Sequence, residues 1–569
     1  MFYQSTLFLL LAGLVLGQTV PLPTTPLIYA DSVLNAGTMA HQSMPVGGIG
    51  RGSLFWIFGR NLGPADAESA DGFPLNKTLG GVGINVAQGR VTVQAYPLYV
   101  QEDSILAVMP SNAPLGTVTV QVVFGRLTSN QARARIAAAA PGLFSLNGSG
   151  EGLALAQNAI NDTVWADNHP NRSARPGQRV SLLLTGLGPL SNGKDAESPD
   201  AGPVSDEIAV NVGGQPADVE YAGRIGGNAG LDQVIIRLAD RTPNGCYVPV
   251  QVIANGSALS NMATISVSPR GGPCSDADNP LSDLFRRGGT IAAGLLLRID
   301  MLNQFAPGGT AKAAGLDRVL GMVRRIPGSP TNFNRLWSQP PAGSCTAYTG
   351  RGNPLSDTGS PGPEGADQDA GVMTVRGAAG SFAIPLVKAP LDYYGSVLSR
   401  QGWAPTYPEA RQILVPGAFS ISWAGIVEGI AAITSSVNAT NAMTWNQRSQ
   451  LAVVPLRREL QLKWENPGGN LTVIQGSVFD RAQYSHAMFV CVAPAGEASF
   501  TVPQEVLRML PASPAGSVST LLLGSLSPGS PSATRSNGIN LRLIDASISG
   551  RTVSFVDNAG SPVANEVKP

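Results

Sequence analysis

The stretch TVTVQV at residues 117–122 places a valine at every second position and a polar residue before each one. This period of two is typical of a β-strand with one face on a hydrophobic core and the other in water. The stretch RVTVQA at 90–95 alternates in the same way. Both are rich in β-branched residues, which favour strands. Short strands punctuated by Gly-Pro and Asn-Gly signals predict an antiparallel sandwich.

The surroundings of this stretch occur twice in the chain, in the same order and about 125 to 131 residues apart. The matching pairs are NLGP at 61–64 and GLGP at 186–189, DAES at 66–69 and 195–198, INV at 84–86 and VNV at 210–212, VQV at 120–122 and 250–252, and SN at 129–130 and 260–261. The repeat predicts two β-sandwich modules, at about 27–140 and 141–270, with the matched motifs on equivalent strands and turns.

The composition also favours a strand-rich chain and argues against a nucleic-acid partner. Among 569 residues, 38 are basic and 38 are acidic, and charged residues make up only 13% of the chain. Nucleic-acid binding needs a concentrated basic surface, and the sequence has no basic run longer than a pair. Glycine (67) and proline (44) are abundant, as expected for many short strands joined by turns.

The N-terminus predicts export. The apolar run LFLLLAGLVL at 7–16 has the length of a signal-peptide core, and residues 1–17 are expected to be removed near Gly17 and Gln18. No later stretch is long and apolar enough to predict a membrane helix. The expected localisation is therefore secreted or extracellular, with no transmembrane segment after cleavage.

Several motifs in the first half resemble known sequences. GSLFWIFGRNLG at 52–63 resembles the opening strand and turn of IPT/TIG-type immunoglobulin-like domains. APGLF at 140–144, RPGQ at 175–178, TGLGP at 185–189, CYVPV at 246–250 and GPCSD at 272–276 resemble an uncharacterised family of secreted acidobacterial proteins. The resemblance spans roughly residues 30 to 276. It implies an exported protein with immunoglobulin-like modules and supplies no activity.

Residues 271–569 predict a larger β-rich C-terminal region, either one domain or two subunits. Strands are expected at 419–423, 460–464, 471–474, 488–492 and 499–502, with a hairpin at the Asn-Pro-Gly-Gly turn, 466–469. Residues 504–510 after Pro503 and the Ala-, Leu- and Met-rich stretch 309–326 are the helix candidates. The predicted fold class is all-β: tandem immunoglobulin-like β-sandwich modules followed by a larger β-rich C-terminal domain with minor helix.

Four cysteines in an exported chain predict disulfides, and three pairings are possible. The pairing in chain order, Cys246 with Cys274 and Cys345 with Cys491, keeps each bridge within one predicted unit. A zinc site is the alternative, but its ligands normally include close Cys-x₂-Cys pairs, and the sequence has none.

Catalytic and metal motifs are scarce. His41, His169 and His486 are the three histidines, and no G-x-S-x-G turn, H-E-x-x-H motif or phosphate-binding loop accompanies them. The two acidic segments that follow corresponding turns are weak calcium candidates, because calcium prefers several oxygen ligands from a loop; they contain Asp66, Glu68, Asp71, Asp195, Glu197 and Asp200. Solvated loop charges are the simpler interpretation. No catalytic residue and no cofactor are predicted.

Three functions remain open on the sequence alone. The first is a non-catalytic extracellular binding or adhesion protein, whose partner is a glycan or a cell-surface protein and whose loops are displayed on a rigid scaffold. The second is a structural spacer or envelope-associated protein without a specific ligand. The third is a secreted hydrolase with its site in the C-terminal half. Trp445, Trp464 and Tyr484 could stack on sugar rings, although packing in the core is the simpler role for them.

Overall fold

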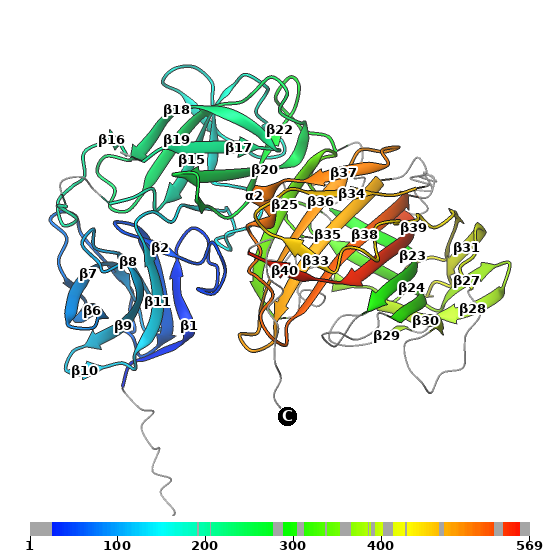
Figure 1. Ribbon diagram of the computed structural model, residues 1–569, viewed down its shortest axis with the longest axis horizontal. Coiled ribbons are helices and arrows are strands. Elements are labelled where there is room, and N and C mark those ends of the chain that lie inside the picture. Colours follow the sequence, from blue (N-terminus) through cyan, green and yellow to red (C-terminus); the bar gives the residue numbers. More distant parts are fainter. Residues whose placement is uncertain are drawn as a thin grey trace, which may run out of the picture.

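The chain forms three β-rich parts, seen in a computed structural model (Figure 1). The first module lies at the lower left of the view, the second module lies above it, and the C-terminal half forms the right-hand side. The structure describes residues 25–189, 193–204, 206–276, 288–303, 312–329, 331–335, 338–352, 366–384, 386–387, 393–401, 413–426, 429–465, 471–528 and 539–557. The expected signal peptide at 1–17 lies outside these ranges.

The first module is a sandwich of two sheets that share one long strand. One sheet contains β1 (Leu27–Asn35), β3 (Leu54–Arg60), β8 (Ser104–Val108), the second half of β7 (Val91–Val100) and the short β4 (Glu68–Ser69). The other contains the first half of β7, β6 (Val82–Gln88), β9 (Gly116–Phe124), β11 (Ala132–Ala137) and the short β2 (Ile49–Gly50), β5 (Thr78–Leu79) and β10 (Leu127–Thr128).

The second module repeats this arrangement. One sheet contains β12 (Gly142–Leu143), β13 (Ala156–Ala159), β14 (Trp165–Asp167), β15 (Arg179–Thr185), β19 (Asp232–Arg237), β16 (Gly202–Pro203) and the second part of β18 (Gln215–Arg224). The other contains the first part of β18, β17 (Ile208–Val212), β20 (Gly245–Ala254), β21 (Ala258–Leu259) and β22 (Ala263–Val267). Both modules therefore have immunoglobulin-like topology, in which one strand passes from sheet to sheet.

The repeated motifs occupy equivalent positions down to the pairing register. Ile84 pairs with Val122 in the first module, and Val210 pairs with Val252 in the second. A register slip of one residue would turn every side chain to the opposite face. All four of these residues are buried, so both copies place the same positions in the core.

The repeated Ser-Asn pair makes the same contacts in both modules. The backbone N–H of Val122 donates to Ser129 Oγ, and that of Val252 donates to Ser260 Oγ, both at 2.9 Å. Asn130 then accepts a hydrogen bond from the N–H of Ile28 at 2.8 Å, as Asn261 does from Leu143. The pair therefore fastens the first strand of each sandwich to a late turn.

The C-terminal half is built on one large sheet, which runs across the right-hand side of Figure 1. This sheet contains, in spatial order, β25 (Ser344–Arg351), β36 (Ser485–Ala493), β35 (Leu471–Asp480), β38 (Val518–Pro528), β39 (Ile539–Thr552), β23 (Gly289–Asn303), β24 (Lys312–Ile326), β30 (Tyr393–Gln401) and β29 (Leu386–Val387), with β26 (Ala366–Asp367) beside β24.

Smaller sheets cover the large one and create two separate hydrophobic cores. One core lies under a four-stranded sheet of β28 (Gly380–Ile384), β27 (Met373–Gly377), β31 (Gly417–Trp423) and β32 (Ile433–Ala439). The other lies under two strand pairs, β33 (Val453–Pro455) with β40 (Ser554–Val556) and β34 (Leu460–Lys463) with β37 (Ser499–Val502). A short helix, α2 (Gln504–Leu507), begins directly after Pro503.

The prediction of an all-β fold is confirmed, and two local predictions in this half are wrong. Residues 312–326 of the expected helix form strand β24, in which every residue from Lys312 to Ile326 pairs with β23. Gly315 and Gly321 each cost roughly 1 kcal/mol in a helix, whereas two neighbouring strands supply backbone partners here. The expected hairpin is also absent from the described pairing, because β34 pairs with β37 and β35 pairs with β36 and β38.

Both disulfides of the chain-order pairing are present. The Cys246–Cys274 bridge connects β20 to the segment that follows the second module, and the Cys345–Cys491 bridge joins the paired strands β25 and β36. The second bridge closes a separation of 146 residues, against 28 for the first. It therefore restricts the unfolded chain over the longer loop.

Buried ion pairs fasten the three parts together. The guanidinium group of Arg224 lies 3.2 Å from Asp232 and donates to the carbonyl oxygen of Gly52 in the first module. Arg335 of the C-terminal half donates to both carboxylate oxygens of Glu151 in the second module, at 2.7 and 2.5 Å. Because these charges are buried, losing either partner would leave an uncompensated ion.

Candidate binding face on the first module

The sheet formed by β7, β6, β9 and β11 has a core side and an outer side with different chemistry. Ile84, Val86, Val120 and Val122 point to the core and are fully buried. The alternate residues are polar: Asn85 pairs across the sheet with Gln94 on one side and with Gln121 on the other. Side-chain amides both donate and accept hydrogen bonds, so this row offers both functions to a ligand.

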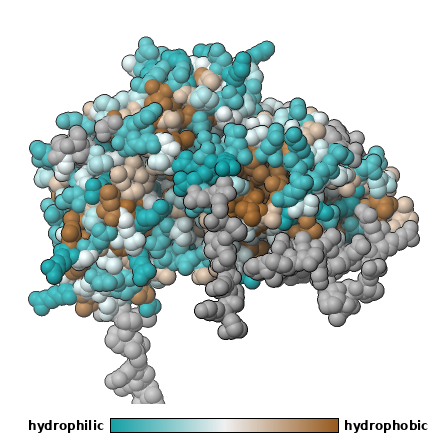
Figure 2. All heavy atoms as spheres, in the orientation of Figure 1, coloured by the Kyte–Doolittle hydropathy of each residue, from teal (hydrophilic) through white to brown (hydrophobic). Residues whose placement is uncertain are grey.

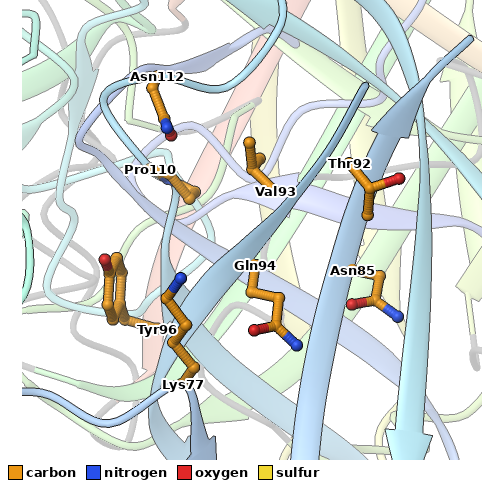
Figure 3. Close-up of a pocket in the computed structure, with 8 residues that line it drawn as sticks. All are labelled: Lys77, Asn85, Thr92, Val93, Gln94, Tyr96, Pro110 and Asn112. Carbon is orange, nitrogen blue, oxygen red and sulfur yellow. The ribbon is translucent and has the colours of Figure 1, made fainter. Parts of the chain in front are cut away.

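A groove of about 430 Å³ lies on this outer side (Figure 3). It is lined by Lys77, Asn85, Thr92, Val93, Gln94, Tyr96, Pro110 and Asn112. Figure 3 shows that the amides of Asn85 and Gln94 extend in the same direction from neighbouring strands, while Lys77 and Tyr96 lie on the other side of Gln94 from Asn85. The lining is mostly polar, with one aromatic ring and one long cationic side chain.

The second module positions two walls of this groove. The carboxylate of Asp195 accepts hydrogen bonds from the backbone N–H of Ser111 at 2.7 Å and from its hydroxyl at 2.5 Å. Ser111 lies between the lining residues Pro110 and Asn112. The N–H of Leu75, two residues before Lys77, donates to the carbonyl oxygen of Ala196 at 2.7 Å. Both wall loops are therefore fixed by the repeated acidic segment of the other module.

The groove also has a distinct electrostatic environment. Burial raises the pKa of the Tyr96 hydroxyl, and the negative charge of Asp195 raises it further. A tyrosine hydroxyl is protonated at neutral pH and can donate a hydrogen bond. A second hollow, of about 280 Å³, lies in the loop around Phe73 and Asn76, and Asp71 lines it.

Part of the equivalent face of the second module is covered by the C-terminal half. Gln251 occupies the position of Gln121, but only 2% of its surface is exposed and its amide contacts the sulfur of Met509. Ile253, Leu259 and Met262 on the same side join a hydrophobic core of the C-terminal half. The repeat therefore produces the same type of face twice, once partly buried by the C-terminal half and once on the surface.

Where the two modules carry different residues at equivalent positions, the residue type matches the exposure of the position. Arg133 of the first module pairs with Thr119, and the equivalent pair in the second module is Thr264 with Pro249. Arg133 is exposed, whereas Thr264 is buried. At this position the charged residue therefore belongs to the exposed copy of the face and the uncharged residue to the buried one. Figure 2 likewise shows mostly hydrophilic residues over the visible surface of the first module.

The six calcium candidates are not brought together. Asp66, Glu68 and Asp71 are exposed in the first module, as are Glu197 and Asp200 in the second. Asp195 was expected in an exposed loop, but only 7% of its surface is accessible because it binds Ser111. Within the described ranges, no three His, Cys, Asp or Glu side chains form a group that could hold a metal ion.

Most of the aromatic and histidine residues noted in the sequence are packed in the protein interior. Trp445 and Trp464 are buried in a core of the C-terminal half, whereas Tyr484 is 65% exposed. His486 is buried, with its Nε2 atom 2.9 Å from Arg335 and its Nδ1 atom facing the carbonyl oxygen of Gly352. The glycine-rich segment 47–52 leads into strand β3 rather than into a helix.

Sequence reasoning did not identify the groove. Asn85 and Gln121 were recognised only as parts of repeated motifs, although their polar character at outward positions was visible. Lys77, Tyr96 and Asn112 come from separate loops and strands, and no spacing along the chain relates them. Only the fold brings them to one surface.

Comparisons with known proteins leave the family open. No protein-family model matches the sequence, and no curated protein matches it. Domains 5–6 of the S-layer protein SbsC are 10% identical and match with a TM-score of 0.15 over 43% of this chain and 98% of that one.

Two further solved structures are similar at the same low level. The Yersinia pseudotuberculosis adhesin InvE is 13% identical, with a TM-score of 0.12 over 50% of this chain and 59% of that one. The I9–I11 tandem of titin is 6% identical, with a TM-score of 0.11 over 68% and 92%. TM-scores this low carry no argument about this chain, whose sandwich topology is read from its own strands.

Among the described residues, no helix is long and apolar enough to cross a membrane.

Proposed function

We propose that this protein is a secreted, non-catalytic binding or adhesion protein, and that the outer face of the first module recognises a glycan. The observation that carries the proposal is the polar groove across β6 and β7, which has amide, hydroxyl and ammonium groups around one tyrosine ring. Sugar hydroxyls need partners that both donate and accept, and an aromatic face offers an apolar platform for a sugar ring.

The rigid setting of the groove supports a binding role. Its walls are fixed by contacts from the second module, and the second module is itself packed on the C-terminal half. A preformed site loses less conformational entropy on binding than a mobile one. We also propose that the expected boundaries, 27–140, 141–270 and 271–569, separate the units of this assembly, and that residues 1–17 direct its export.

A glycan array tests the proposal. The secreted chain is expected to retain a defined set of glycans, and the Asn85→Ala and Gln94→Ala double variant is expected to lose that retention. Replacing Asn211 and Pro216, which occupy the equivalent positions in the second module, is the matched control. Retention that is unchanged in the groove variant would contradict the assignment of the face.

The structural-spacer alternative has one observation in its favour. The modules are joined by buried polar contacts that span separate parts of the chain, such as Arg224 with Gly52 and Glu151 with Arg335. Such contacts would hold a fixed spacing between the ends of the protein. A chain that binds no glycan but keeps one interdomain geometry in small-angle scattering would support this alternative.

A further inference from the structure

We infer that the ligand of the first-module face is an acidic polysaccharide, one whose sugar units carry carboxylate groups. The inference rests on the proposed glycan-binding function and adds the chemical class of the ligand. Three observations carry it: the predominantly basic charge of the face, the positions of Lys77 and Arg133 relative to the groove, and, within the described part of the chain, the lack of side-chain hydrogen bonds and ion pairs at these two residues.

The charge of the face is predominantly basic. Between residues 76 and 137 the chain has five basic residues, Lys77, Arg90, Arg126, Arg133 and Arg135, and two acidic ones, Glu102 and Asp103. Both acidic residues lie in the turn between β7 and β8. The described strands β6, β7, β9 and β11 contain no Asp or Glu. Asp195 of the second module lies beside the groove, but its carboxylate is bound to Ser111, and the only charged side chains on the strands of the face themselves are basic. A predominantly basic surface attracts an anionic ligand.

Two of the cationic residues are related to the groove: Lys77 lines it, and Arg133 ends a row of paired residues that begins in it. Thr92, which lines the groove, pairs with Ala87, Ala87 pairs with Thr119, and Thr119 pairs with Arg133. These residues form one row across four strands. With neighbouring strands roughly 4.8 Å apart, the row is about 14 Å long. Lys77 lines the groove and Arg133 ends the row, so an extended chain can contact both.

Lys77 and Arg133 are available for a ligand. Within the described part of the chain, neither makes a side-chain hydrogen bond or an ion pair, and both are exposed. Arg135 differs, because it donates to the carbonyl oxygens of Met44 and Pro45, and burial lowers its pKa. It contributes charge to the face but has fewer free donors. An arginine can bind a carboxylate through two parallel hydrogen bonds.

The comparison between the modules strengthens the inference. The second module has Thr264 and Ser266 in place of Arg133 and Arg135, and both are buried within that module, where the N–H of Thr264 donates to Gly152 and that of Ser266 donates to Asn168. The inward positions stay apolar in both modules. At these two positions, basic residues therefore occur in the exposed copy of the face and not in the buried one.

Calorimetric titration with two matched polysaccharides tests the inference. Polygalacturonate oligosaccharides carry carboxylates, and their methyl esters keep the same backbone without the charge. We expect the secreted chain to bind the charged form at least tenfold more tightly, and to bind it less tightly as salt is added. The Lys77→Gln and Arg133→Gln double variant should lose about tenfold in affinity for the charged form.

The Arg60→Gln variant is the control, since Arg60 is exposed on β3 in the opposite sheet, and it should change the affinity less than about twofold. Equal binding of both polysaccharides, or charge variants that bind like the wild type, would overturn the inference. Binding of neutral glycans that depends on Asn85 and Gln94 would leave the proposed function standing while the acidic ligand class fails. If neither acidic nor neutral glycans bind, the proposed function fails as well.

Discussion

The Ser-Asn pair of the repeat allows one interaction to be compared in two environments. Asn261 is buried, and it accepts from the N–H of Leu143 at 2.8 Å and donates to the carbonyl oxygens of Leu143 and Gly150 at 2.9 and 2.6 Å. Asn130 makes the matching contacts to Ile28, at 2.8 and 3.1 Å, but it is exposed.

Replacing each asparagine by alanine should therefore have unequal costs. In the second module, a buried donor and two buried acceptors lose their partner, and an unsatisfied buried group costs roughly 1–3 kcal/mol. We expect Asn261→Ala to lower the free energy of unfolding by about 3–5 kcal/mol. In the first module, water can replace the amide, and we expect Asn130→Ala to cost about 1 kcal/mol.

Urea unfolding followed by tryptophan fluorescence measures both variants. The shift of the urea midpoint at a constant m-value gives the difference in the free energy of unfolding. Equal costs for the two variants would refute the reasoning, because burial would then not determine the value of this contact. A smaller cost for Asn261→Ala would refute it more strongly.

Three further predictions concern the interface, the buried carboxylate and the disulfide. Asp195→Asn should lower the stability by about 1–3 kcal/mol and weaken glycan binding. The two groups of Ser111 donate to different oxygens of Asp195, and in asparagine one of these atoms is a nitrogen that cannot accept. An unchanged melting temperature and unchanged glycan binding would contradict this. Burial raises the pKa of Asp232 from 3.8 to about 6, so the folded state binds more protons than the unfolded state between these values. The stability of the wild type relative to Asp232→Asn should then fall as the pH rises from 4 to 7, and urea titrations that show a rise or no change would contradict it. Replacing Cys345 and Cys491 by alanine should cost about 2–5 kcal/mol, measured by thermal unfolding, with the Cys246 and Cys274 double variant as the comparison.

The sequence predicted those features of the fold that local patterns determine. The alternation of Val118, Val120 and Val122 identifies a strand and its buried face. The same VQV motif recurs at 250–252 in the second module, and it predicts that Val250 and Val252 are buried as well. Both statements follow from a period of two, which needs no knowledge of distant partners.

Features decided by distant contacts were not predicted. Residues 312–326 contain alanine, leucine and methionine, which are good helix formers, but pairing with β23 and β30 places them in a sheet. Asp195 has the same local sequence as Asp66, yet it is buried because Ser111, 84 residues earlier, lies against it. The groove escaped prediction for the same reason.

Hydroxyl-radical footprinting with bound polygalacturonate tests the central claim most directly, because it reports which side chains a ligand covers. Tyr96 in the groove should become less reactive on binding, as should the peptide that contains Pro110. Tyr29 and Tyr484, which are 49% and 65% exposed, serve as references within the same chain and should keep their reactivity. Protection of Tyr484 with no change at Tyr96 would contradict the account and would place the ligand on the C-terminal half.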